Sequence, residues 1–110
     1  MKKLILFVLI GIFPFLACAA PTVTEYAKCN GILILAAAMT KENDPEKFRI
    51  YMENAKALES KASKLKGYDK GVFREMSFDS SGNYMDMLKG GAASKQDFWA
   101  DAGYCRGLAQ

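Results

Sequence analysis

The sequence predicts an all-α fold: a small up-down bundle of about four helices, with one disulfide joining the first helix to the last. Three observations indicate this fold. Apolar residues recur at three- and four-residue steps in four successive segments. Residues that favour helix N-termini precede these segments, and glycines follow several of them. The chain contains no strand-like alternation, internal repeat or low-complexity tract.

The N-terminal stretch has the layout of a secretory signal peptide. Lys2 and Lys3 supply a positively charged start, and residues 4–17 form an apolar run without a charge. Small residues at 17–19 then offer a cleavage site before Ala20. We therefore expect the mature chain to begin at Ala20.

This layout predicts two regions: a signal peptide over residues 1–19 and a single helical domain over residues 20–110, located in the periplasm or outside the cell. An uncleaved membrane anchor would need about 20 apolar residues, and Pro14 interrupts this shorter run. Residues 15–18 resemble the bacterial lipobox, which ends in a lipidated cysteine, although the first two positions depart from its usual residues. Membrane contact is thus expected only if Cys18 is lipidated.

Charge and cysteine content narrow the class of protein further. Without Lys2 and Lys3, the 15 basic residues fall to 13 against 12 acidic ones, a net charge of +1. Such a chain gives no electrostatic reason to expect nucleic acid as a partner. Cleavage leaves Cys29 and Cys105, which in an oxidising compartment most simply form one bridge. Closing a loop of about 75 residues contributes on the order of 4 kcal/mol in the chain-entropy account.

The first helix is predicted over residues 23–40. Thr22 and Glu25 have the spacing of a capping box, and Tyr26 opens an apolar helical face. Every residue from 31 to 39 is apolar or glycine, so we expect the second half of this helix to lie deep between other helices.

The second helix is expected to begin after Asp44, with Pro45 in its first turn, and to end near Gly67. This gives a helix of about 22 residues, or about 33 Å. Its apolar positions recur at helical spacing: Phe48, Tyr51, Met52, Ala55, Leu58, Ala62 and Leu65.

The third segment begins near Asp69 and ends at Gly90 and Gly91. Residues 79–82, Asp-Ser-Ser-Gly, interrupt it, so two short helices are an alternative to one continuous helix. A continuous helix is favoured because the residues of one face keep their phase across the interruption: Phe73, Met76, Ser80, Tyr84 and Met87.

The fourth helix is predicted over residues 95–109, after the N-cap Ser94 and the acidic Asp97. Cys29 lies about 9 Å from the start of the first helix, and Cys105 lies five residues, or about 8 Å, from the last residue of the sequence. In an up-down bundle the two cysteines then lie at the same height along the bundle axis. The disulfide can therefore join two antiparallel terminal helices.

The sequence contains no histidine, which removes the commonest general base and the usual haem and zinc ligand. It also lacks a haem-attachment motif, a phosphate-binding loop and a nucleophile elbow, so we expect no cofactor, no metal and no catalytic residue. The methionines are interpreted as core filling. The alternative to a binding protein is a hydrolase that uses carboxylates, which could come from Glu25, Glu53, Glu59, Glu75 or the acidic residues of the fourth helix.

A locally basic stretch suggests a site for an anionic partner. Five lysines fall within 15 residues, against Glu59 and Asp69. They are Lys56, Lys61, Lys64, Lys66 and Lys70. The alternative is a solvated helix end whose lysines complement the helix dipole.

Aromatic residues near the helix ends, such as Trp99 and Tyr104, suggest an exposed recognition patch. Periplasmic immunity proteins, inhibitors and small chaperones share this size, export and single disulfide. The sequence therefore predicts a binding protein of the bacterial envelope with a protein partner, and it leaves the oligomeric state open.

Overall fold

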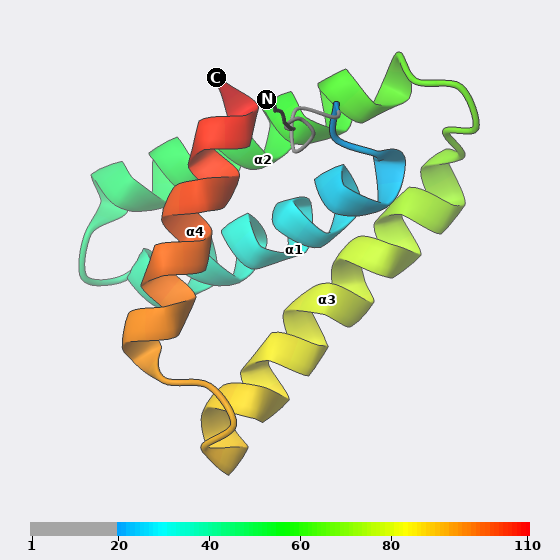
Figure 1. Cartoon of the computed structure of the whole chain (residues 1–110). Helices are drawn as coiled ribbons and strands as arrows, with labels where there is room; N and C mark the ends of the chain where they lie inside the picture. The colour runs from blue at the N-terminus through cyan, green and yellow to red at the C-terminus, as the bar shows by residue number, and fades with distance from the viewer. Residues whose placement is uncertain (1–19) are drawn as a thin grey trace, which may run out of the picture.

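A computed structural model describes residues 20–110, which form four α-helices and are 80% helical. The helices are α1 (Val23–Thr40), α2 (Pro45–Ser63), α3 (Lys70–Gly90) and α4 (Lys95–Ala109). Figure 1 shows α1 in the middle, with α2 and α3 on either side and α4 lying across α1 and α2. The predicted all-α fold with four helices is confirmed. The predicted signal peptide and Cys18 lie outside the described residues.

Local sequence determines where all four helices begin. The Thr22 hydroxyl accepts a hydrogen bond from the backbone N–H of Glu25, whose carboxylate accepts one from Thr22, so a capping box starts α1. Ser94 and Asp97 form the same arrangement at α4. Asp44 caps α2 through the N–H of Lys47. At α3, the Asp69 carboxylate accepts a hydrogen bond from the backbone N–H of Val72. These are the starts that the sequence predicts.

Helix α2 ends at Ser63, a few residues before the expected end at Gly67. Gly67 has a positive φ of 87° and lies in the turn that leads to α3. Glycine adopts this left-handed conformation without the steric cost of a Cβ atom. Gly67 therefore reverses the direction of the chain, but it does so in the turn after α2 and not at the last residue of the helix.

Helix α3 is continuous across Gly82 and ends at Gly91, whose φ of 82° gives a left-handed C-cap. Only three of its residues are buried: Phe73, Ser77 and Tyr84. Helix α3 therefore lies at the edge of the fold and touches the core along a narrow face.

The main core lies where α1, α2 and α4 meet, around Leu33, Leu58 and Phe98, each fully buried. Cys29 and Cys105 form a disulfide in this core, with their Cα atoms 5.2 Å apart. The predicted covalent link between the first and last helices is confirmed. A smaller cluster joins Ala27, Ala62 and Phe73 near the start of α1.

Helix α1 is the hub of the fold, because its substantial contacts include all three other helices, whereas α3 makes its substantial contacts with α1 alone. Leu33, Leu35 and Ala36 are buried as expected for a central helix. Ile34, however, is 40% exposed, so no helix within residues 20–110 covers this side of α1. The expectation that the apolar half of α1 is covered on all sides is wrong at this position.

Candidate binding groove

The uncovered side of α1 forms the floor of a groove between α2 and α3. The groove has a volume of about 480 Å³ and is open to solvent along one side. Its walls come from positions 52–59 of α2 and 74–81 of α3. The lining residues are Asn30, Ile34, Met52, Ala55, Lys56, Glu59, Arg74, Ser77, Phe78 and Ser81.

A buried polar link fixes the width of this groove. The side-chain amide of Asn30 donates a hydrogen bond to the carbonyl of Ala55 in α2, with an N–O distance of 2.7 Å. Its amide oxygen accepts a hydrogen bond from the hydroxyl of Ser77 in α3, 2.5 Å away. Because both Asn30 and Ser77 are buried, these bonds replace water and hold α2 and α3 at set positions on α1.

Gly31 sets the distance between α1 and α3. A Cβ atom at this position would overlap the backbone carbonyl oxygen of Ser77. The neighbouring Ser80 hydroxyl donates a hydrogen bond of 3.0 Å to the carbonyl of Lys28. The two helices therefore cross through small and polar groups, and the larger residues of α3 are left free to face the groove and the solvent.

Apolar side chains stand open to solvent at this groove. Phe78 on α3 is 79% exposed, and Ile34 on the floor is 40% exposed. A large apolar side chain with most of its surface in water is a feature of binding surfaces when it borders a concave apolar region. The sequence analysis did not single out Phe78. The available clue was that Phe78 falls out of phase with the buried face of its helix.

Charged groups line the edges of the groove. On one edge, Glu59 accepts hydrogen bonds from Tyr68 and from Arg74, at 3.0 and 3.3 Å. Partial burial, followed by the bond to Glu59, raises the pKa of Tyr68 above its usual value. Lys56 lies exposed beside Glu59, and within residues 20–110 no ion pair involves it.

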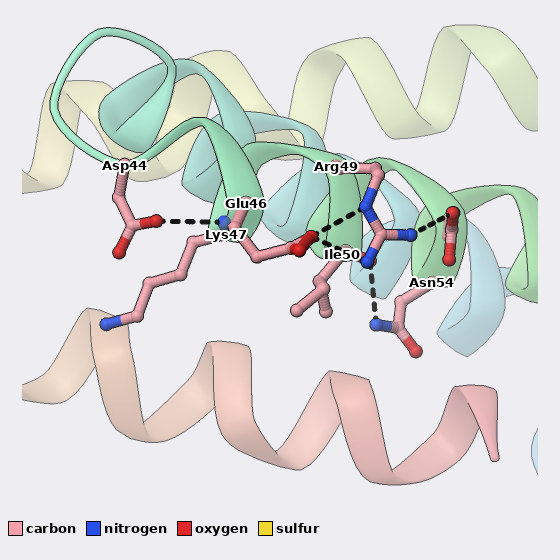
Figure 2. A network of polar contacts seen from close by, with 7 residues as sticks. Asp44, Glu46, Lys47, Arg49, Ile50 and Asn54 are labelled. Atoms are coloured by element: carbon pink, nitrogen blue, oxygen red, sulfur yellow. Dashed lines mark hydrogen bonds and ion pairs between the residues drawn. The ribbon is translucent and has the colours of Figure 1, made fainter.

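The other charged network of α2 contrasts with Lys56. Figure 2 shows Arg49 beside Glu46 of its own helix. The guanidinium forms ion pairs with the carboxylates of Glu46 and Glu53, at 2.6 and 2.5 Å. Hydrogen bonds, the one to Glu46 foremost, raise the pKa of Arg49 above its usual value. This guanidinium is neutralised in place, whereas the ammonium group of Lys56 makes no ion pair within the described residues.

The five lysines of the predicted basic patch have different structural roles. The Lys61 ammonium donates hydrogen bonds to the backbone carbonyls of Leu108 and Gln110, so it caps the end of α4. Lys56 lines the groove. Lys64, Lys66 and Lys70 are exposed between the end of α2 and the start of α3.

The candidate carboxylates of a hydrolase are also placed by the structure. Glu25 belongs to the capping box of α1, Glu53 pairs with Arg49, Glu59 bonds to Tyr68 and Arg74, and Glu75 is exposed. Within residues 20–110 no group of three or more acidic or cysteine side chains is arranged to hold a metal ion.

The methionines and the terminal aromatic residues are only partly core. Met85 and Met87 are 39% and 40% exposed, so their interpretation as core filling is wrong. Tyr84 and Phe98 are buried, whereas Trp99 and Tyr104 are 36% and 59% exposed. Some of these aromatic side chains are thus available at the surface, on α4.

None of the four helices described here is long and apolar enough to cross a membrane. The chain matches no protein-family model, and neither a curated protein nor a solved structure is significantly similar to it. The disulfide is compatible with a periplasmic or extracellular location. The function must therefore be argued from the groove itself.

Proposed function

We propose that this protein is an exported binding protein of the bacterial envelope, of the immunity, inhibitor or chaperone type, and that it binds a protein partner in the groove between α2 and α3. The observation that carries the proposal is Phe78, which is 79% exposed at the edge of a groove whose floor includes the exposed Ile34. Exposed apolar side chains that border a concave apolar surface are typical of sites that bind another protein.

The chemistry of the groove supports binding rather than catalysis. Its buried polar groups, Asn30 and Ser77, are bonded to each other, and Glu59 already accepts bonds from Tyr68 and Arg74. A general base must be free to take a proton from a substrate. The polar groups of this groove instead hold the helices in place, and the apolar groups are those left open.

Photo-crosslinking in the source bacterium tests this function. A photoreactive amino acid at Ile34 should give a discrete cross-linked product in the envelope fraction, and the purified partner should then bind the purified protein. The same amino acid at the exposed Gln96 of α4, outside the groove, is the matched control. Phe78→Ser should remove the product at Ile34. An identical product from Gln96, or one that Phe78→Ser leaves unchanged, would contradict binding in the groove.

A further inference from the structure

We propose that the segment bound in this groove is an amphipathic α-helix of the partner, which places apolar side chains against Ile34 and Phe78 and an acidic side chain against Lys56. This inference rests on the proposed function and adds to it the conformation and the charge of the bound segment. Three features of the groove carry it: its length, the nature of its walls and the sign of the charge along its edges.

The dimensions of the groove suit a helix. Its walls, positions 52–59 and 74–81, each span about two helical turns, or about 10 Å along the axis. Helices α2 and α3 both pack on α1 and, apart from the ion pair between Glu59 and Arg74, make no substantial contact with each other. A helix lying between them would contact α1 over Ile34, as the three existing helices contact α1 elsewhere. Apolar anchors on that helix would be spaced i, i+4 and i+7.

The walls also discriminate against an extended peptide. Both walls are helices, and the backbone N–H and C=O groups inside a helix already bond to one another. An extended segment in the groove would therefore have few partners for its own backbone groups, and an unbonded buried polar group is costly. A helical segment satisfies its backbone internally and presents only side chains to the groove.

An acyl chain fits this groove less well. Sites for small apolar ligands enclose most of the ligand surface, whereas this groove is open along one side. Asn30 and Ser77 also place polar groups at its floor. A partner helix brings its own polar outer face to cover the open side.

The charges along the groove favour an acidic partner over a second copy of this chain. Two cations, Lys56 and Arg74, face one carboxylate, Glu59, which Arg74 already engages. Helix α3 of a second copy carries three basic and three acidic residues, so it would bring no net negative charge to this groove. An acidic side chain on a foreign helix would instead pair with Lys56.

Peptide binding to the purified residue 20–110 protein tests the inference. The probe is a fluorescein-labelled 14-residue helical peptide with leucine at three positions spaced i, i+4 and i+7 and glutamate on both flanks. One comparison peptide has lysine in place of glutamate, and a second keeps the glutamates but has a central proline that breaks the helix. Fluorescence anisotropy should show the acidic helix binding about tenfold more tightly than either comparison peptide.

Variants of the protein identify the contacts. Lys56→Glu should reverse the preference, so that the basic peptide binds more tightly than the acidic one. Lys47→Glu makes the same charge change on α2 outside the groove and should preserve the preference. Phe78→Ser should weaken binding of the acidic peptide by about 30-fold, as expected for a central aromatic contact. Circular dichroism of each variant establishes that the fold is retained.

Each other outcome overturns the inference. Equal binding of the acidic and basic peptides would refute the charge assignment, and equal binding of the proline-containing peptide would refute the helix. If none of the peptides binds while the Ile34 cross-link is still formed, the proposed function stands and the helical acidic segment is wrong. Sedimentation as a dimer that Phe78→Ser dissociates would assign the groove to a second copy. Binding of a fluorescent fatty acid in the groove, without binding of any peptide, would assign the groove to a lipid.

Discussion

The two sides of α1 are packed in different ways. Towards α4, the interface holds a disulfide, a fully buried Phe98 and the nearly fully buried Ala102. Towards α3, it consists of a close crossing at Gly31 and hydrogen bonds from two serines, with larger anchors only at Phe73 and Tyr84. One central helix therefore carries both a covalent apolar interface and a polar interface of small residues.

This difference explains why the candidate groove lies beside α3. Hydrophobic burial between α1, α2 and α4 stabilises the fold without help from the exposed groove residues Ile34 and Phe78. The interface between α1 and α3 fixes the distance between these two helices and buries little apolar surface. The apolar residues of α3 therefore need not all face the core. The same helix can then present Phe78 to a partner while the remaining core stays closed.

The largest effect should come from breaking the covalent interface. The double variant Cys29→Ala, Cys105→Ala should lose about 2–5 kcal/mol of unfolding free energy, measured by denaturant titration. Hydrogen exchange should show α4 losing protection first, because it is C-terminal and short. Uniform loss of protection in all four helices would instead show one cooperative unit. Mass spectrometry of the unreduced protein that found two free thiols would exclude the disulfide.

The polar interface can be broken at its closest point. Gly31→Ala places a methyl group where the Ser77 carbonyl lies, so α3 must move away from α1, at a cost of about 1–3 kcal/mol. Gly82→Ala is the matched control, because a Cβ atom there meets no other group. It should stabilise α3 by up to about 1 kcal/mol through its helix propensity. Equal effects of the two substitutions would contradict the close crossing.

Alkaline pH should loosen the link between α3 and α4. Burial, and then the hydrogen bond of 2.6 Å to Asp101, raises the pKa of Tyr84 from 10.0 to about 12. The unfolded chain therefore loses this proton before the folded one. The resulting stability is present below pH 10 and is lost as the pH rises towards 12, by about 1–2 kcal/mol.

Tyr84→Phe should remove this part of the pH dependence, measured as unfolding free energy at intervals between pH 9 and 12. Tyr104→Phe, at an exposed position of α4, should retain it. An unchanged slope in the Tyr84 variant would show that the hydroxyl does not link the two helices.

The smallest effect on stability should come from the groove surface. Phe78→Ser should change the unfolding free energy by no more than about 0.5 kcal/mol, because most of the side chain is already in water. A loss comparable to that of Gly31→Ala would show that Phe78 belongs to the packing between α1 and α3. Such a result would mean that the groove surface also stabilises the fold.

Local chemistry explains which parts of the fold could be predicted. Thr22, Asp44 and Ser94 satisfy backbone groups within a few residues of themselves, so helix starts can be found from neighbouring residues alone. The disulfide followed from the position of each cysteine along its helix. Gly82 did not interrupt α3, since one glycine costs less than the packing of Phe73 and Tyr84 on either side provides.

The groove could not be predicted in this way. Periodicity shows which faces of a helix are apolar, but not how many neighbours cover them, so the exposure of Ile34 was hidden. The role of Lys61 depends on carbonyls 47 and 49 residues away. The crossing at Gly31 depends on Ser77, which belongs to a different helix. These features arise only when distant segments meet.

The disulfide also determines how the molecule responds to mechanical force. Cys29 lies near the start of α1 and Cys105 near the end of α4, with a sequence separation of 76, so α2 and α3 lie wholly within the closed ring. Tension applied at residues 20 and 110 passes directly across the sulfur bridge. Only the short outer parts of α1 and α4 can be stretched, and both walls of the groove remain unloaded.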